Sequence, residues 1–134
     1  MGYRSDVTLG VAFPSMEDLV AFVTKIKLAG TMPPEEWEHY YTTPLGGGAA
    51  LLHATFNDVK WYESYPDVQG HIAMYGQANS DEYATAFVRI GEGQDDTVVE
   101  IIDPNDEYYL WDYFNVRREL IAPKGGEPLI KGDN

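Results

Sequence analysis

The stretch YATAFVRIGEGQDDTVVEIID, residues 83–103, predicts a β-hairpin. In its first half, Val88 and Ile90 lie at alternate positions, which is the period of a strand with one apolar face. Residues 97–102 form the second strand of the pair. Two glycines within residues 91–96 supply the unusual backbone angles that the turn requires.

The residues at the start of the chain predict one strand followed by one helix. Apolar and polar side chains alternate over residues 4–13, as in a strand with one buried face. Ser15 then begins a helix-start pattern, because its side chain can cap a helix and Asp18, three residues on, can bond back. Gly30 is a natural stop for this helix.

The middle of the chain predicts two further helices around one strand. Residues 31–43 are expected to form a shorter helix, since Pro33 and Pro34 suit a helix start. Residues 49–61 alternate as a second strand. Ser64 repeats the capping pattern and predicts a helix that continues to residue 75.

After the hairpin, residues 104–113 predict a short helical turn and residues 114–121 a last strand. Helices cluster early and antiparallel strands late. We therefore expect an α+β fold, a two-layer sandwich with a mainly antiparallel sheet of about five strands and two to four helices. Residues 1–122 are expected to form a single globular domain, and residues 123–134 a flexible C-terminal tail.

The composition excludes several kinds of site and ligand. The 134 residues include no cysteine, so disulfides, thiolate zinc sites and a cysteine nucleophile are excluded. The net charge of −13 makes nucleic acids and anionic membranes unfavourable direct ligands, since each is a polyanion. No signal peptide and no apolar run long enough to span a membrane is apparent. We expect a cytoplasmic protein.

No motif in the chain predicts catalysis, a cofactor or a metal site. The three histidines lack zinc-site spacing and are expected to be surface or half-buried residues. The triple glycine at residues 46–48 precedes a strand, not a helix, so it predicts a mobile loop and not a phosphate cradle. Glu92, Asp95, Asp96 and Glu100 carry oxygen ligands that suit calcium, but a solvated hairpin tip explains their spacing better.

The negative charge is concentrated between residues 63 and 112. This region holds twelve acidic residues, one basic residue and several interleaved aromatic residues. Two interpretations stay open: a solvated face above an aromatic core, and a protein-binding face with Tyr and Trp anchors. The candidate protein-binding residues are Glu92, Asp95, Asp96, Asp103, Asp106, Glu107, Tyr108, Tyr109, Trp111 and Asp112.

Three stretches together resemble a group of small bacteriophage-encoded proteins without an assigned activity. They are GYRSDV at residues 2–7, VKWYESYPDV at residues 59–68 and FVRIGE at residues 87–92. The resemblance implies a phage origin and residence in the cytoplasm of a bacterial host. It carries over no catalytic residues. Small phage proteins often bind and disable a host enzyme or a defence system, which sets an expectation for this chain.

Two functional hypotheses follow. The first is a non-enzymatic inhibitor that binds a host DNA-handling or defence protein, such as a topoisomerase or gyrase, a restriction enzyme or a CRISPR complex. Its acidic surface would mimic the charge of DNA. The second is a protein that binds or sequesters a small molecule or nucleotide, in which aromatic rings stack on a base and arginines meet the phosphate. Edge strands also allow a homodimer.

Overall fold

The computed structural model describes residues 4–93, 96–104, 107–108, 110, 114–116, 120–121 and 127–128. Its main feature is a six-stranded sheet in which all neighbouring strands are antiparallel. Across the sheet, the strands are β5 (Thr97–Ile102), β4 (Ala84–Gly91), β1 (Ser5–Phe13), β3 (Ala50–Val59), β2 (Tyr40–Pro44) and β8 (Glu127–Pro128). The predicted α+β fold is confirmed.

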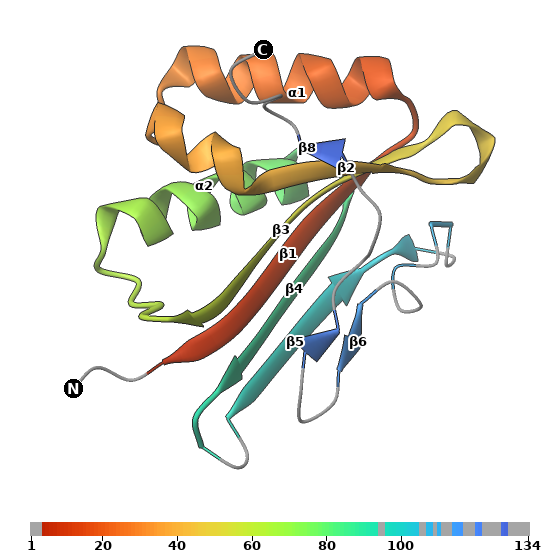
Figure 1. Ribbon diagram of the computed structural model, residues 1–134. Coiled ribbons are helices and arrows are strands. Elements are labelled where there is room, and N and C mark those ends of the chain that lie inside the picture. The colour runs from red at the N-terminus through yellow and green to blue at the C-terminus, as the bar shows by residue number, and fades with distance from the viewer. Residues whose placement is uncertain are drawn as a thin grey trace.

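Two helices, α1 (Met16–Ala29) and α2 (Pro66–Ser80), lie on the same side of this sheet (Figure 1). Leaving aside the short 3-10 helices, the chain follows the order β1-α1-β2-β3-α2-β4, and these strands lie in the order β4-β1-β3-β2. This is the ferredoxin-like, or split βαβ, arrangement. Such a fold hosts many unrelated functions, so the arrangement alone assigns none.

The predicted ends of α1 are confirmed. The side-chain oxygen of Ser15 accepts a hydrogen bond from the backbone N–H of Asp18 at 3.1 Å, which satisfies one donor of the first turn. Gly30 follows the helix with a φ of 67°, a left-handed conformation that glycine adopts without steric cost. The local sequence therefore sets the length of α1.

The helix predicted over residues 31–43 is wrong. Only a short 3-10 helix, η1 (Pro34–His39), forms there, and the chain then enters β2. The reason lies in the residues that follow His39, because Tyr and Thr favour a pleated strand over a helix. Tyr40 is fully buried in β2 and pairs with Ala54 of β3. The tertiary contact with β3 thus ends the helical turn.

Three smaller predictions are also corrected. Helix α2 is not capped by Ser64, since it begins at Pro66 after Tyr65, whose side chain makes no cap hydrogen bond. A proline in the first turn loses no hydrogen bond there.

The glycines of residues 46–48 form a 3-10 turn, η2. In place of one strand over residues 114–121, β6 (Asn115–Val116) pairs with β7 (Leu120–Ile121).

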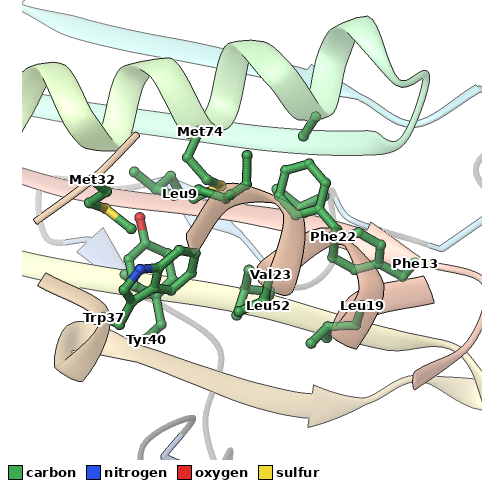
Figure 2. Close-up of a cluster of buried hydrophobic side chains, with 14 of the residues drawn as sticks. Leu9, Phe13, Leu19, Phe22, Val23, Met32, Trp37, Tyr40, Leu52 and Met74 are labelled. Carbon is green, nitrogen blue, oxygen red and sulfur yellow. The ribbon is translucent and has the colours of Figure 1, made fainter. Parts of the chain in front are cut away.

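The helices bury the main core against one face of the sheet (Figure 2). Phe13 of β1 lies between Phe22 of α1 and Tyr83, with ring centroids 5.4 Å and 4.6 Å away. Trp37 and Tyr40 fill the other side of this cluster, and both are at most 1% exposed. Burying such side chains is the main source of stability in a fold of this size.

A second apolar cluster covers the opposite face of the sheet. Leu110 and Phe114, which follow β5 in the chain, are buried against Ala86 and Val88 of β4. A Cβ atom at Gly10 would lie 2.7 Å from the Phe114 ring, so glycine allows this close approach. The predicted flexible tail lies largely outside the described residues, although the backbone of β8 pairs with β2.

Candidate functional site: an aromatic groove at the open end of the sheet

The helices do not cover the whole of their side of the sheet. The start of β1 and the β4–β5 turn lie at the end of the sheet farthest from α1 (Figure 1). A cavity of about 740 Å³ opens there between the sheet and the β3–α2 connection. Its lining consists of Ser5, Trp61, Tyr62, Glu63, Ser64, Phe87, Arg89, Asp96 and Val98.

A second cavity of about 310 Å³ continues the first toward α2. The two cavities share Glu63, Phe87 and Val98, and we call the combined depression the groove. The second cavity also reaches Tyr75 of α2 and Glu100 of β5. The groove therefore has a floor of β4 and β5 side chains and walls from α2 and the β3–α2 connection.

Aromatic rings form much of the groove. The centroid of Trp61 lies 6.3 Å from Phe87, and Phe87 lies 5.8 Å from Tyr75. Trp61 also leans on Phe56 at 5.6 Å, which holds its indole against the core. Trp and Tyr are effective binding anchors, because they bury a large area and keep one polar group for a hydrogen bond.

One ion pair neutralises part of the charge in the groove. The guanidinium of Arg89 donates two hydrogen bonds to the carboxylate of Asp96, at 2.7 Å and 3.2 Å. A third, at 3.3 Å, goes to the side-chain oxygen of Ser5. These contacts fasten the hairpin end to the start of β1. A bidentate pair of this kind has a fixed geometry, so it holds Arg89 in place.

Two further carboxylates leave the groove negative. Glu63 is exposed, and Glu100 accepts a hydrogen bond from the Tyr75 hydroxyl at 2.8 Å. Burial raises the pKa of Tyr75 to about 12, and the Glu100 carboxylate beside it acts in the same direction, so Tyr75 stays a donor. Among the described lining residues, three carboxylates, including Asp96, and one guanidinium give a net charge of −2.

The structure describes five of the ten predicted binding residues. Asp95, Asp106, Tyr109, Trp111 and Asp112 lie outside the described part of the chain. Asp96 lines the groove, and Glu92 is exposed beside Arg4 and Asp6. Glu107 is exposed, and Tyr108 is half-buried against the Leu110 and Phe114 cluster. Only Asp96 of the described five therefore lines the groove.

Asp103 has a structural role in the turn after β5. Its carboxylate accepts hydrogen bonds from the backbone N–H groups of Tyr108 and Leu110, at 3.0 to 3.2 Å. Asp96 and Asp103 lie beyond opposite ends of β5, seven residues apart. At about 3.3 Å per residue, this separates them by roughly 23 Å. The structure does not bring these two predicted site residues together.

The residues that reasoning from the sequence missed come from separate elements. Trp61, Tyr62 and Glu63 lie in a polar connection between β3 and α2, where three aromatic residues within residues 61–65 are unusual. That cluster of aromatic residues could have indicated a binding site from the sequence alone. Phe87 and Val98 carried no signal of their own, because alternation in a strand shows only that one face is apolar.

A buried hydrogen-bonded chain lies behind one wall of the groove. The Tyr40 hydroxyl bonds Nδ1 of His71 at 2.8 Å, and Nε2 of His71 bonds Glu36 at 2.9 Å. His71 is 1% exposed, so its prediction as a surface or half-buried residue is wrong, as it is for His53 at 5%. Burial lowers the pKa of His71, and Glu36 opposes this shift. These side-chain hydrogen bonds connect η1 and β2 to α2.

This hydrogen-bonded chain has a structural role in the geometry described. Tyr40 is fully buried, and these hydrogen bonds occupy both ring nitrogens of His71, whose ring borders the second cavity of the groove. Within the described residues, no group of three His, Asp or Glu side chains is arranged to hold a metal ion, and no helix is long and apolar enough to cross a membrane.

Compared with known protein families, curated proteins and solved structures, the chain shows no match.

Proposed function

We propose that this chain is a non-enzymatic binding protein of phage origin that inhibits a host DNA-handling or defence protein, using the groove to hold a basic part of that partner. The observation that carries the proposal is the lining of the groove. Aromatic walls stand beside Glu63 and Glu100, and once Arg89 is paired with Asp96, no other cation among the described lining residues offsets their charges.

A protein partner suits this lining better than a polyanion does. Interfaces are enriched in Tyr and Trp at their centres, and the half-buried Trp61 and Tyr62 line the groove. A lysine or arginine beside Trp61 would gain a cation–π contact and an ion pair with Glu63. The net charge of −13 would also speed the approach of a basic partner at low salt.

The groove also refines the idea of DNA mimicry. Exposed carboxylates occur on many elements, for example Glu17 on α1, Glu38 on η1 and Glu82 before β4. Such a spread gives long-range attraction to a DNA-binding surface, without a fixed row of phosphate-like groups. We assign attraction to the dispersed acids and anchoring to the groove.

A small ligand is the second candidate function. A cavity of about 740 Å³ has the volume of an ordinary ligand pocket, and Trp61 offers a ring on which a base could stack. However, a phosphate group would have to displace Asp96 from Arg89 and would face Glu63. The charge of the groove therefore ranks this function second.

The test is capture of partners from bacterial lysate by three forms of the protein. These are the wild type, a groove variant carrying Trp61→Ala and Glu63→Lys, and a control carrying Glu38→Lys, an exposed position outside the groove. Partners identified by mass spectrometry are then purified, and their Kd is measured at two salt concentrations. We expect the groove variant to bind at least about tenfold more weakly than the control, which would match a lost anchor of about 1.4 kcal/mol or more.

Two results would contradict the proposal. Equal binding by the groove variant and the wild type would show that the groove does not hold the partner. Co-purification of a nucleotide or metabolite, with no protein that binds, would favour the second function. Charge reversal at Glu17, Glu82 and Glu107, exposed acids outside the groove, tests the dispersed acids separately, and we expect it to slow association more than it speeds dissociation.

A further inference from the structure

We propose, on the basis of the function above, that the partner enters as an extended strand that pairs with the edge of β5 opposite β4 and turns alternate lysine or arginine side chains into the groove. The occupant is thus a basic, extended segment of a protein. Strand addition of this kind combines backbone hydrogen bonds for affinity with side-chain contacts for specificity.

Strand β5 has the properties of an edge that is available for pairing. It lies at the end of the sheet, and among the described strands it pairs only with β4. Val98, Val99 and Ile102 are 38% to 44% exposed. Proteins normally protect such edges with charged side chains, proline or a bulge; TVVEII contains no proline or lysine, and its one charge, Glu100, would repel an acidic strand and attract a basic one.

The register identifies which backbone groups of β5 point outward. Gly91 donates its N–H to the carbonyl of Asp96 at 2.7 Å, while the N–H of Asp96 turns to Gly93, so this pair ends the ladder at a hydrogen-bonded position. Hydrogen-bonded pairs alternate along an antiparallel ladder, and Val98 and Glu100 therefore bond to β4. The N–H and C=O groups of Thr97, Val99 and Ile101 then point away from β4.

The side chains of β5 relate this edge to the groove. Val98 and Glu100 line the groove, while Ile101, with the opposite parity, contacts the cluster on the other face. A strand added beside β5 would place every second side chain about 5 Å from Val98 or Glu100. Cations at those positions would meet Glu100 and could reach Glu63.

Charge favours a basic segment over a second copy of this chain. Pairing two β5 strands in the register that joins Val98 to Ile102 would place the two Glu100 carboxylates opposite each other. Like charges directly opposite are destabilising, and the two chains would each carry a charge of −13. A lysine-bearing segment removes both obstacles.

The test uses a synthetic octapeptide of alternating lysine and threonine with blocked ends. The control peptide has the same sequence with every second backbone nitrogen methylated, so it keeps the charge and loses hydrogen-bond donors. We expect the unmodified peptide to bind at least tenfold more tightly by calorimetry. It should also slow amide hydrogen exchange at Thr97, Val99 and Ile101 at least tenfold, measured by NMR.

A matched pair of variants isolates the edge from the groove. Val99→Pro removes an N–H that β4 does not use, and proline is tolerated at such edge positions. Val99→Thr keeps that N–H. We expect Val99→Pro to weaken peptide binding at least tenfold and Val99→Thr to leave it within twofold, with unchanged amide spectra in β4 confirming that both fold.

The possible results separate this inference from the function on which it rests. If Val99→Pro binds the peptide normally while Glu63→Lys does not, strand pairing is wrong and groove binding stands. If wild-type protein binds neither peptide, strand addition by a basic segment is wrong. If size-exclusion chromatography shows a dimer that Val99→Pro dissociates, a second copy occupies the edge and the inference is again wrong.

Discussion

The sheet face that carries the helices has a closed end, which is packed beneath them, and an open end, which lines the groove. The two ends differ in how deeply their side chains are buried. At the closed end, Phe13, Phe22 and Tyr83 contact one another, and the two phenylalanines are at most 3% exposed. At the open end, Arg89 and Val98 of the same face remain partly accessible and line the groove. The strands continue past the helices that cover them (Figure 1).

This difference separates stability from recognition within one face. A sheet face that a helix covers excludes water and contributes most of the burial energy. The part of a sheet face that no helix covers must carry polar groups, because it would otherwise be an exposed apolar patch. Here Arg89, Asp96 and Glu100 provide those groups, so the open end keeps aromatic rings accessible without exposing a continuous apolar surface.

The largest expected effect contrasts the two ends directly. Phe22→Ala at the closed end should lower the free energy of unfolding by about 3–5 kcal/mol, because it leaves a cavity in a tightly filled core. Trp61→Ala at the open end should cost less than half as much, since Trp61 is only partly buried. Urea unfolding followed by circular dichroism measures both. Equal losses would show that the open end is as tightly filled as the closed end.

The next effect concerns the opposite face of the sheet. Gly10→Ala should cost about 1–3 kcal/mol, because the new Cβ would overlap the Phe114 ring. Gly76→Ala is the matched control, since Gly76 is exposed in α2 with no atom within 4 Å of such a Cβ. That change should stabilise the helix by roughly 0.5–1 kcal/mol. A neutral Gly10→Ala would mean that Phe114 moves away at little cost.

The third effect depends on pH and on His53, which is buried in β3. Burial lowers the pKa of His53 to about 4, and its Nε2 bonds the Thr43 hydroxyl at 2.7 Å. The unfolded chain takes up this proton below about pH 6.5, whereas the folded protein does so only near pH 4. The unfolded state therefore binds more protons between these values, and stability falls as pH falls. Between pH 6.5 and 5 the loss should be roughly 1–2 kcal/mol.

The measurement is the urea midpoint of wild-type protein, His53→Gln and His71→Gln across that range of pH. His53→Gln should remove most of the slope, because glutamine does not titrate. His71→Gln should remove less, since Glu36 opposes the lowering of the His71 pKa. Identical slopes in all three proteins would assign the acid sensitivity to other groups.

The smallest effect concerns the ion pair at the open end. Asp96→Asn should lower stability by less than about 1 kcal/mol, because the Arg89 and Asp96 side chains are 22% and 33% exposed and partly screened by water. The control is Glu92→Gln, an exposed acid of the same turn. A loss above about 2 kcal/mol would mean that this pair contributes to stability on the scale of the closed-end contacts.

Much of the fold could be predicted from local patterns. Strand β5 matches its prediction at both ends, and α1 begins and ends at the residues that cap it. The prediction failed at β2. Pro33 and Pro34 begin a helical turn, but pairing with β3 makes the following residues a strand and not a longer helix. It failed again over residues 114–121, where two short strands pair with each other. Pairing partners are not encoded within a short window of sequence.

The candidate site was less predictable than the fold. The acidic residues could be read from the sequence, but whether they share one face could not, and the structure places Asp96 and Asp103 beyond opposite ends of β5. Asp103 bonds backbone N–H groups, a role that composition does not reveal. The aromatic connection at residues 61–65 was visible too, but its neighbours in the groove were not.

The sequence by itself determined the α+β class, the charge of −13 and the ends of α1, because composition, periodicity and capping act over a few residues. Only the tertiary structure decided that Ser5, Trp61, Phe87 and Val98 line one groove. These residues lie on different strands and one connection, and the register of β1, β4 and β5 brings them together. A register is set by the burial of whole faces, which no single segment specifies.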